Sequence, residues 1–409
     1  MVTTHARQAE PLAPPAPPAD NSDATLVPRR RPGHIGAVNV MQIAVAEAVL
    51  LVVLSMLRHT LWLLVAGVLG GLLLVVLTFG RHRGRWWTEH IALRWQYRRR
   101  TRSGQEPTED HRLALLHELV PDLTVHNVEG SGGVRIGVGC DAAGWFVVLE
   151  VTPTDGMSGA ARQPLPLDAL AKAIKDVDQP GVVLQVVTHS VPAPSDMEAA
   201  SQPSSRSYCE LVQPVGGSVP ADQVSWISVR LDARTLAEAA VGAEDAAQAA
   251  PVVLAALIRP AGKTLKRAGL AYRILDADAV MDALALSLAL DAMDQTRPHE
   301  LWRRWQSTRL GHVSFWLQRW PAVGAAEGLL SRLAGTQSAF TTVATIVEPR
   351  EDGIDLRCLV RVAADPMSLD ATCAELQMTA KASGARLFRL DGEHAPAAYA
   401  SAPSGGGAL

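Results

Sequence analysis

The sequence predicts an α+β protein in which an N-terminal two-helix transmembrane hairpin precedes a mixed α+β domain in the cytosol. Three observations predict this organisation. Two apolar runs, 35–57 and 61–79, lie almost back to back near the N-terminus. Arginines gather on both flanks of that pair. From residue 107 onward, segments with the period of a strand alternate with segments that have the period of a helix.

We therefore expect five parts along the chain. They are a disordered Pro- and Ala-rich tail (1–32), two transmembrane helices (33–80), a basic membrane-proximal helix (81–106), the cytosolic domain (107–395) and a second disordered tail (396–409). The formal net charge of −3 hides an asymmetry, because arginine surrounds the apolar runs while the later domain carries most of the acids. A globally basic nucleic-acid-binding protein is therefore not expected.

Both apolar runs are long enough to cross a membrane, since a bilayer core of about 30 Å takes about 20 helical residues. Only residues 58–60 separate them, which predicts a hairpin with a short turn. Residues 29–31 are all arginine, and eight more arginines follow the second run between 81 and 102. The positive-inside rule then places both termini in the cytosol, so we expect a multi-pass protein of the inner (plasma) membrane.

Three residues within the hairpin are candidate contacts to other helices. Gly67 and Gly71 are four apart, a spacing that lets a neighbouring backbone approach closely, although pairing between the two spans explains them equally well. Glu47 is an acid within a span and must face protein or water. Its side chain either contacts a partner subunit, or reaches the membrane–water interface, or stays within the membrane in its protonated form.

The stretch GRWWTEHIALRWQYRRRTR continues directly from the second apolar run. At helical spacing Trp87 and Trp95 share one side, with Arg98, Arg99 and Arg100 nearby. Such a helix suits anionic inner-leaflet lipid, with aromatic rings at headgroup depth and guanidinium groups on phosphate. Alternatively, it is a rigid extension of the span that docks on a partner. Nucleic acid is disfavoured, because RNA binding needs no adjoining membrane anchor.

The cytosolic domain contains a repeated order of elements. A hairpin, a helix and a strand occur at 133–188 and again at 340–390, which predicts two ββαβ half-units of ferredoxin-like character. Between and around them we expect further strands at 224–231, 272–275 and 312–318, an Ala-rich helical stretch at 232–266 broken near Pro251, and helices at 276–291 and 325–333. A Pro/Ser-rich loop covers 191–207.

No catalytic, cofactor-binding or metal-binding residues are predicted. Gly262-Lys263-Thr264 resembles the end of a phosphate-binding loop but lies within a helical pattern. Asp276 and Asp278 could form a metal-binding acidic pair, yet they stand at a helix start, where Asp caps free N–H groups. The four cysteines lack a CxxC pair and are expected to be buried free thiols.

The segment 299–320 (HELWRRWQSTRLGHVSFWLQRW) concentrates tryptophan and arginine, two residue types enriched at protein interfaces. Trp302 and Trp305 are therefore candidate interface residues. Intramolecular stacking of arginine on tryptophan at a domain edge explains the composition equally well.

Several segments in order resemble the EccE component of actinobacterial type VII (ESX) secretion systems. Besides the hairpin and the basic stretch, they are VHNVEGSGGVRIGVGCDAAGWFVVLEV, WISVRLDARTLAEAAV, LIRPAGKTLKRAGLAYRILDADAVMDALALSL and the Trp/Arg segment. The likeness covers roughly residues 33–395. It implies a membrane-complex subunit that works beside EccB, EccD and the ATPase EccC, with no catalytic residues of its own.

The expected function is a non-enzymatic, membrane-anchored subunit that scaffolds or stabilises a type VII secretion complex, without a cofactor. Two alternatives from other classes remain at this point. One is a membrane-anchored, glycosyltransferase-like enzyme built on Asp276 and Asp278. The other is a cytosol-facing sensor that binds a small ligand.

Overall fold

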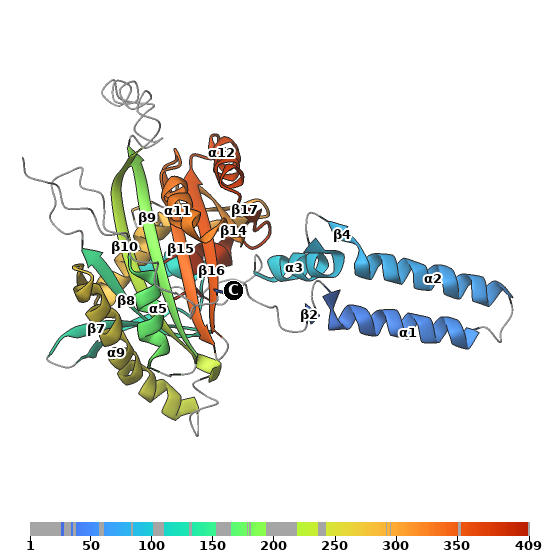
Figure 1. Ribbon diagram of the computed structural model, residues 1–409, viewed down its shortest axis with the longest axis horizontal. Helices are drawn as coiled ribbons and strands as arrows, with labels where there is room; N and C mark the ends of the chain where they lie inside the picture. The colour runs from blue at the N-terminus through green and yellow to red at the C-terminus, as the bar shows by residue number, and fades with distance from the viewer. Residues whose placement is uncertain are drawn as a thin grey trace, which may run out of the picture.

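The computed structural model consists of a sheet domain and a helical arm that projects from it (Figure 1). It describes residues 26–27, 34–35, 38–56, 61–82, 85–100, 110–130, 133–152, 165–177, 179, 181–193, 219–235, 243–291, 293–294, 296–350 and 353–407. Most of the predicted N-terminal tail and Pro/Ser-rich loop, and the turn at 57–60, lie outside these residues.

In the described residues the domain is built on one thirteen-stranded sheet. Its main path runs β12 (His299–Leu301), β13 (Arg304–Gln306), β14 (Gly311–Arg319), β16 (Gly353–Ala364), β15 (Phe340–Arg350), β9 (Val182–Ala193), β10 (Val219–Asp232), β8 (Gly144–Thr152), β7 (Arg135–Asp141) and β6 (Thr124–Glu129). Neighbours on this path are antiparallel. Off the path, β11 (Ala271–Ile274) pairs with β8, β17 (Arg386–Arg389) with β14, and β1 (Leu26–Val27) with β16 in parallel.

The fold is therefore mixed α+β, as predicted, and the repeated order of hairpin, helix and strand is present. The two repeats nevertheless do not form separate sheets. Strand β10 lies between β8 and β9 of the first repeat, and β14 lies between β16 and β17 of the second. Pairing of β9 with β15 then joins the two repeats edge to edge. A period-two pattern predicts strands but does not encode which strand becomes the neighbour of which.

One side of the sheet, here named the α9 face, is mainly apolar, with Ser190, Thr341 and Thr345 as buried polar exceptions. It is covered by α5 (Leu167–Lys175), α9 (Ala243–Arg267), α11 (Ala326–Ala334) and α12 (Leu369–Ala382). Buried Val, Leu and Ile side chains of β7–β10 pack on α5 and α9, and those of β14–β16 pack on α11 and α12. Helix α9 runs continuously through Pro251 and Pro260, whereas the sequence predicts a break.

The opposite side, the α13 face, carries α4 (His111–His117), α10 (Ala277–Leu288) and α13 (His394–Ser401). The sequence predicts a disordered tail from residue 396, but the structure places α13 and a buried segment there. Apart from Tyr399 and Leu409 the residues are Ala, Ser, Gly and Pro, a composition that resembles a linker. Their small side chains instead fit a narrow space on the sheet. Pro396 is tolerated because it lies in the first turn of α13.

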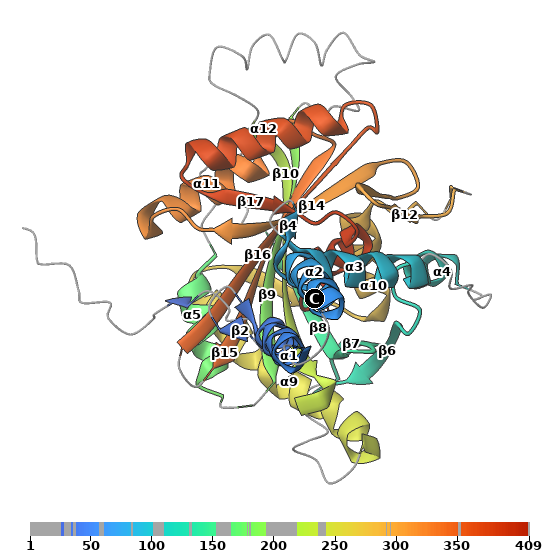
Figure 2. The same ribbon diagram turned by 90° about the vertical axis from the view of Figure 1, so that its right-hand side faces the viewer.

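The projecting arm contains α1 (Val40–Met56), α2 (Leu61–Phe79) and α3 (Trp87–Arg100) (Figures 1 and 2). Helix α1 begins five residues later than the predicted first span, because β2 (His34–Ile35) and β3 (Val38–Asn39) precede it as a short ladder. A further short ladder joins β4 (Arg81–His82) to β5 (Arg85–Trp86) between α2 and α3. Among the residues that the structure describes, no helix combines the length and the apolarity that a membrane crossing needs.

Candidate interface at helix α3

Helix α3 lies between the α1–α2 pair and the sheet domain, and its two sides differ (Figure 1). His90, Leu93, Tyr97 and Arg100 recur at spacings of three and four, so they share one side of the helix. This side faces the β12–β13 hairpin. The other side carries Trp87, Ile91 and Trp95, which are exposed. The helix thus docks on the domain with one side and presents the other outward.

The docking side is held by a charge-assisted contact to β12. The Arg100 guanidinium donates to the Glu300 carboxylate at 3.3 Å from both Nε and Nη2, and the Glu300 side chain is only 5% exposed. Burial raises the pKa of Glu300 above its ordinary value, while Arg100 and the backbone N–H of Ala395 act against that rise. The Tyr97 hydroxyl donates to the Glu300 carbonyl oxygen at 3.2 Å.

Trp302 completes the docking. Its ring meets the rings of His90 and Tyr97 edge-on, each at a centroid distance of 5.4 Å. Edge-to-face packing of aromatic rings adds about 0.5–1.5 kcal/mol beyond the burial of their area. Arg100 and Trp302, predicted as interface residues, are therefore brought together within one chain.

The outward side of α3 forms a mixed aromatic and basic strip, made of Trp87, Ile91, Trp95, Arg94, Arg98 and Arg99. Ile91 is 64% and Trp95 is 59% exposed, and the Arg99 guanidinium lies 4.4 Å from the Trp95 ring centroid. Arg94, Arg98 and Arg99 are also exposed. The strip combines apolar area with positive charge, a combination that suits an anionic, partly apolar surface.

Trp305 occupies a different environment from its neighbour Trp302. It is 1% exposed and belongs to the buried core of the α13 face, where its ring lies 4.7 Å from the His312 ring, tilted by 57°. The interface role predicted for it is therefore replaced by core packing. The difference follows from position, because Trp302 lies in the turn between β12 and β13 whereas Trp305 is the buried middle residue of β13.

The three candidate contact residues of the α1–α2 pair, Gly67, Gly71 and Glu47, lie in different surroundings. A Cβ placed on Gly71 would meet the Val49 side chain of α1 at 2.7 Å, so this glycine permits close packing between α1 and α2. A partner helix is not needed to explain it. Gly67 is partly buried, and Glu47 is exposed on α1.

Sequence reasoning missed Glu300, Tyr97, His90 and Gly392, which complete the α3 contact. The available signal was charge: Glu300 is an acid next to an arginine-rich segment, and its natural partner is an arginine of another basic segment. Tyr97 and His90 share the helix side that carries Leu93 and Arg100, a pattern that marks a docking side.

The acidic pair at α10 is accounted for by local structure. Asp276 caps α10, accepting from the Ala279 N–H at 3.0 Å, and the Asp278 carboxylate binds Arg112 at 3.2 Å. Asp276 and Asp278 line an open groove of about 510 Å³ beside Glu150, Arg273 and other residues. Within the described residues, no group of His, Cys, Asp and Glu could hold a metal ion.

The other tempting fragments also have structural explanations. Gly262, Lys263 and Thr264 lie inside helix α9, so the loop needed to surround a phosphate is not formed there. Cys358 and Cys373 are buried free thiols, and burial raises the pKa of each to about 12. Such thiols are poor nucleophiles, because the thiolate is the reactive form.

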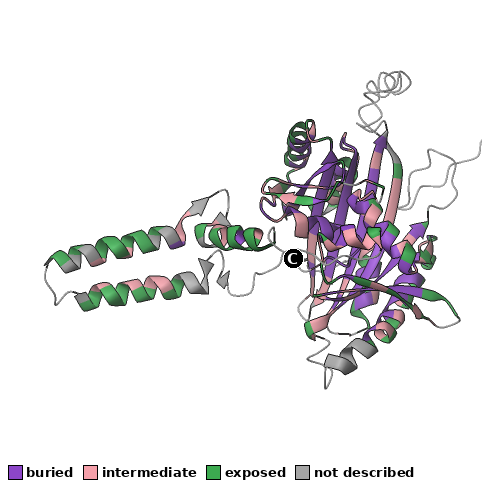
Figure 3. Ribbon diagram, turned by 180° about the vertical axis from the view of Figure 1, so that it is seen from behind, coloured by how far each residue is buried: buried purple, intermediate pink, exposed green. Residues whose placement is uncertain are grey.

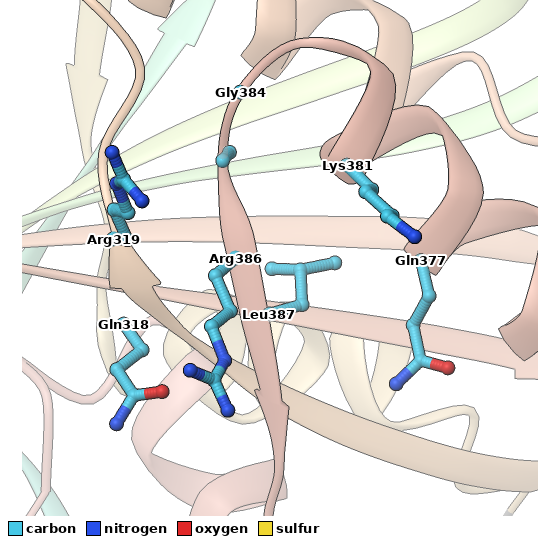
Figure 4. Close-up of a pocket in the computed structure, with 8 residues that line it drawn as sticks. Gln318, Arg319, Gln377, Lys381, Gly384, Arg386 and Leu387 are labelled. Atoms are coloured by element: carbon cyan, nitrogen blue, oxygen red, sulfur yellow. The ribbon is translucent and has the colours of Figure 1, made fainter.

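A second groove, of about 550 Å³, lies where the end of α12 approaches β17 and β14 (Figure 4). Its described lining includes the cations Arg319, Lys381 and Arg386, the amides Gln318 and Gln377, and no carboxylate. In Figure 4 the Arg386 head and the Gln318 amide extend in the same direction from neighbouring strands. The groove is open and its side chains are exposed, so it offers positive charge without an enclosed site.

No curated protein matches this chain. Residues 219–317 match a family model described as "Putative type VII ESX secretion system translocon, EccE". The matched segment runs from β10 through α9 and α10 to β14, and it includes Glu300 and Trp302 of the α3 contact. The match supports the resemblance to EccE that the sequence indicates, over these residues.

Proposed function

We propose that this chain is a non-enzymatic, membrane-anchored subunit that scaffolds a type VII secretion complex. One observation carries the proposal. An arm with a largely exposed apolar surface (Figure 3) is fixed by α3 to a sheet domain in which the buried side chains of Glu300, Arg230 and Arg361 bind other groups of the chain. The family match supports membership of such a complex.

The exposed apolar surface of α1 and α2 supports the anchoring. Leu50, Leu51, Leu69, Leu72 and Leu73 are each about 60% exposed. Soluble monomers rarely expose contiguous apolar patches of this kind, and lipid is the occupant that matches it. Arginines at both ends of the pair support a cytosolic position for the two termini under the positive-inside rule.

The strip on α3 extends the anchor onto the inner leaflet. Trp87 and Trp95 would lie at headgroup depth, and Arg94, Arg98 and Arg99 would face anionic phosphates. Each basic residue near such a surface contributes about 1 kcal/mol to binding. The energy for export would come from the complex's ATPase, which the resemblance implies is EccC, with EccB and EccD as the other membrane subunits.

Affinity purification of the tagged full chain from its native cell in mild detergent, followed by mass spectrometry, tests the scaffold. We expect a large complex that contains a membrane ATPase and other secretion subunits. Recovery of the chain alone, under conditions that preserve other membrane complexes, would contradict the proposal and favour the enzyme or the sensor.

Vesicle flotation of the purified full chain tests the lipid contact separately. Replacing Arg94, Arg98 and Arg99 with Gln should weaken binding to anionic vesicles and leave binding to zwitterionic vesicles unchanged. Arg100 stays in place, because it holds α3 to Glu300. The matched control replaces three exposed basic residues of α9, Arg259, Lys263 and Arg267, and should bind as the unmodified chain does. Equal weakening in both variants would contradict a specific role for α3.

A further inference from the structure

The Glu300 carboxylate joins two elements that are distant in sequence. One side of it receives Arg100 from α3, and Oε1 accepts the backbone N–H of Ala395, in the first turn of α13, at 3.1 Å. Because one buried carboxylate serves both, the positions of α3 and α13 depend on each other. We name the four residues Arg100, Glu300, Gly392 and Ala395 the clasp.

Gly392 fixes the geometry of the clasp. Its carbonyl oxygen accepts from Arg100 Nη2 at 2.6 Å, and its N–H donates to the Trp302 carbonyl at 2.7 Å. It has a φ of +79°, and a Cβ there would meet the Trp302 ring at 2.7 Å. Only glycine satisfies both conditions, so the chain turns into α13 directly against the end of α3.

Beyond the clasp, residues 397–406 form a strap across the α13 face. Arg361 of β16 donates to Ser401 Oγ at 2.7 Å, and Gln185 of β9 donates to the Ala400 carbonyl at 2.7 Å. Arg230 of β10 donates to the Ser404 carbonyl at 2.8 Å, and the Tyr399 hydroxyl donates to Asp141 at 2.6 Å. The strap therefore bonds to side chains from four strands of the sheet.

The floor beneath the strap combines polar and apolar side chains. Gln185, Arg230 and Arg361 are buried there, and Arg361 bonds only to neutral groups in the described residues: Ser401, His312, Ser287 and Thr342. Water can hydrate these polar groups if the strap leaves. The strap also belongs to an apolar cluster, in which Ala397, Ala398, Tyr399, Ala400 and Ala402 accompany Trp226 and Ile346. Apart from Tyr399 and Pro403 its side chains are small, so its opening exposes less apolar area than opening of the α9 face, which helices rich in Leu and Ile cover.

We propose that the strap is a detachable cover whose closed state is held by α3 through the clasp. Displacement of α3 from β12 removes Arg100 from Glu300 and Gly392, and the strap then exposes the floor with its cations Arg230 and Arg361. The arm and the centre of the sheet are thereby coupled. This inference rests on the contacts alone and holds whether or not the secretion role is confirmed.

Hydrogen–deuterium exchange with mass spectrometry on the full chain in lipid nanodiscs tests the coupling. In Arg100→Ala, amides of residues 397–406 should exchange about tenfold faster, the effect expected when a charge-assisted hydrogen bond is lost. Amides of β9 and β10 should keep their protection. Arg94→Ala, on the same helix but outside the clasp, is the matched control and should leave the strap unchanged.

Glu300→Gln provides a second variant that keeps the shape of the side chain. Its amide oxygen still accepts the Ala395 N–H, so the strap should exchange faster than in the unmodified chain but more slowly than in Arg100→Ala. Unchanged exchange of residues 397–406 in both variants would overturn the proposal. A rise spread equally over the strap, β9 and β10 would also overturn it, because that result indicates general destabilisation.

Discussion

The two faces of the sheet are stabilised by different forces. The α9 face is mainly an apolar interior of aliphatic side chains and Phe315 under four helices, with the hydroxyl groups of Ser190, Thr341 and Thr345 among them. The centre of the α13 face holds Gln185, Arg230 and Arg361 beneath the strap, each satisfied by hydrogen bonds. Burial of apolar area is non-directional and tolerates small shifts, while a buried polar layer requires each partner in place. Substitutions on the two faces should therefore fail for different reasons.

The largest effect is expected from a cavity in the α9 face. Phe315→Ala should lower the free energy of unfolding by about 4 kcal/mol, because a fully buried ring is removed and the space collapses only in part. Urea unfolding of the full chain in mild detergent measures it. Leu286→Ala, at an exposed position of α10, should change stability by less than about 0.5 kcal/mol. A similar loss in the two variants would contradict the burial argument.

The next largest effect is expected when an ion pair on the α13 face is broken by substitution. Asp141 and Arg230 form a buried pair, with a second contact at 3.1 Å. Asp141→Ala leaves the guanidinium buried without its carboxylate and should cost about 3 kcal/mol, whereas adding Arg230→Met should recover most of that loss. Asp282→Ala removes an exposed carboxylate that binds Arg112 and is the control. Failure of the double variant to recover stability would show that the pair is not the cause.

The dependence of stability on pH should report on the α13 face, which holds the buried His189 and His312. Burial, together with the Arg361 charge, lowers the pKa of His189 to about 3, and burial likewise lowers the pKa of His312. Between about pH 6.5 and pH 3 the unfolded chain binds protons that the folded chain does not, so stability should fall as pH falls through this window. The expected slope is about 1.4 kcal/mol per pH unit for each histidine.

Thermal unfolding between pH 7 and pH 5 measures that slope. His189→Gln should reduce it, and His126→Gln, at an exposed position of β6, should leave it unchanged. An identical slope in both variants would assign the pH dependence to other groups.

The smallest effect concerns a buried hydroxyl of the α13 face. Ser228 is fully buried, and its Oγ has no hydrogen-bond partner among the described atoms. Ser228→Ala should therefore be neutral or stabilise the chain by up to about 1 kcal/mol, because an unsatisfied polar group is removed. If Ser228→Ala lowered the free energy of unfolding by more than about 1 kcal/mol in the same urea experiment, Ser228 Oγ would have a hydrogen-bond partner after all, and the prediction would be wrong.

Much of the fold can be predicted from the pattern of residues. Strands such as β7, β8, β15 and β16, and helices α5, α10 and α12, occur where alternation and helical spacing predict them. What local pattern does not contain is long-range pairing, such as β10 between β8 and β9. Helix α13 was missed because Ala, Ser and Gly in a tail resemble a linker, and only a site elsewhere on the sheet makes them core residues.

The candidate interface could be predicted only in part, because local pattern does not say which distant segments meet. Arg100 and Trp302 were predicted from composition, since arginine and tryptophan favour contact surfaces. Their places in one contact, and the role of Glu300 as the partner of Arg100, depend on the docking of α3 on β12. Trp305 shows the limit of composition, because the same residue type three positions along belongs to the core.

The place of the strap in the chain has a consequence for biosynthesis. Residues 397–406 leave the ribosome after every strand that they cover, while the arm emerges among the first described elements. Before the strap is in place, α3 can already reach β12, and a sheet formed by then has water on the polar groups of the floor. Gln185, Arg230 and Arg361 keep part of that surface polar, which lowers its tendency to aggregate during translation.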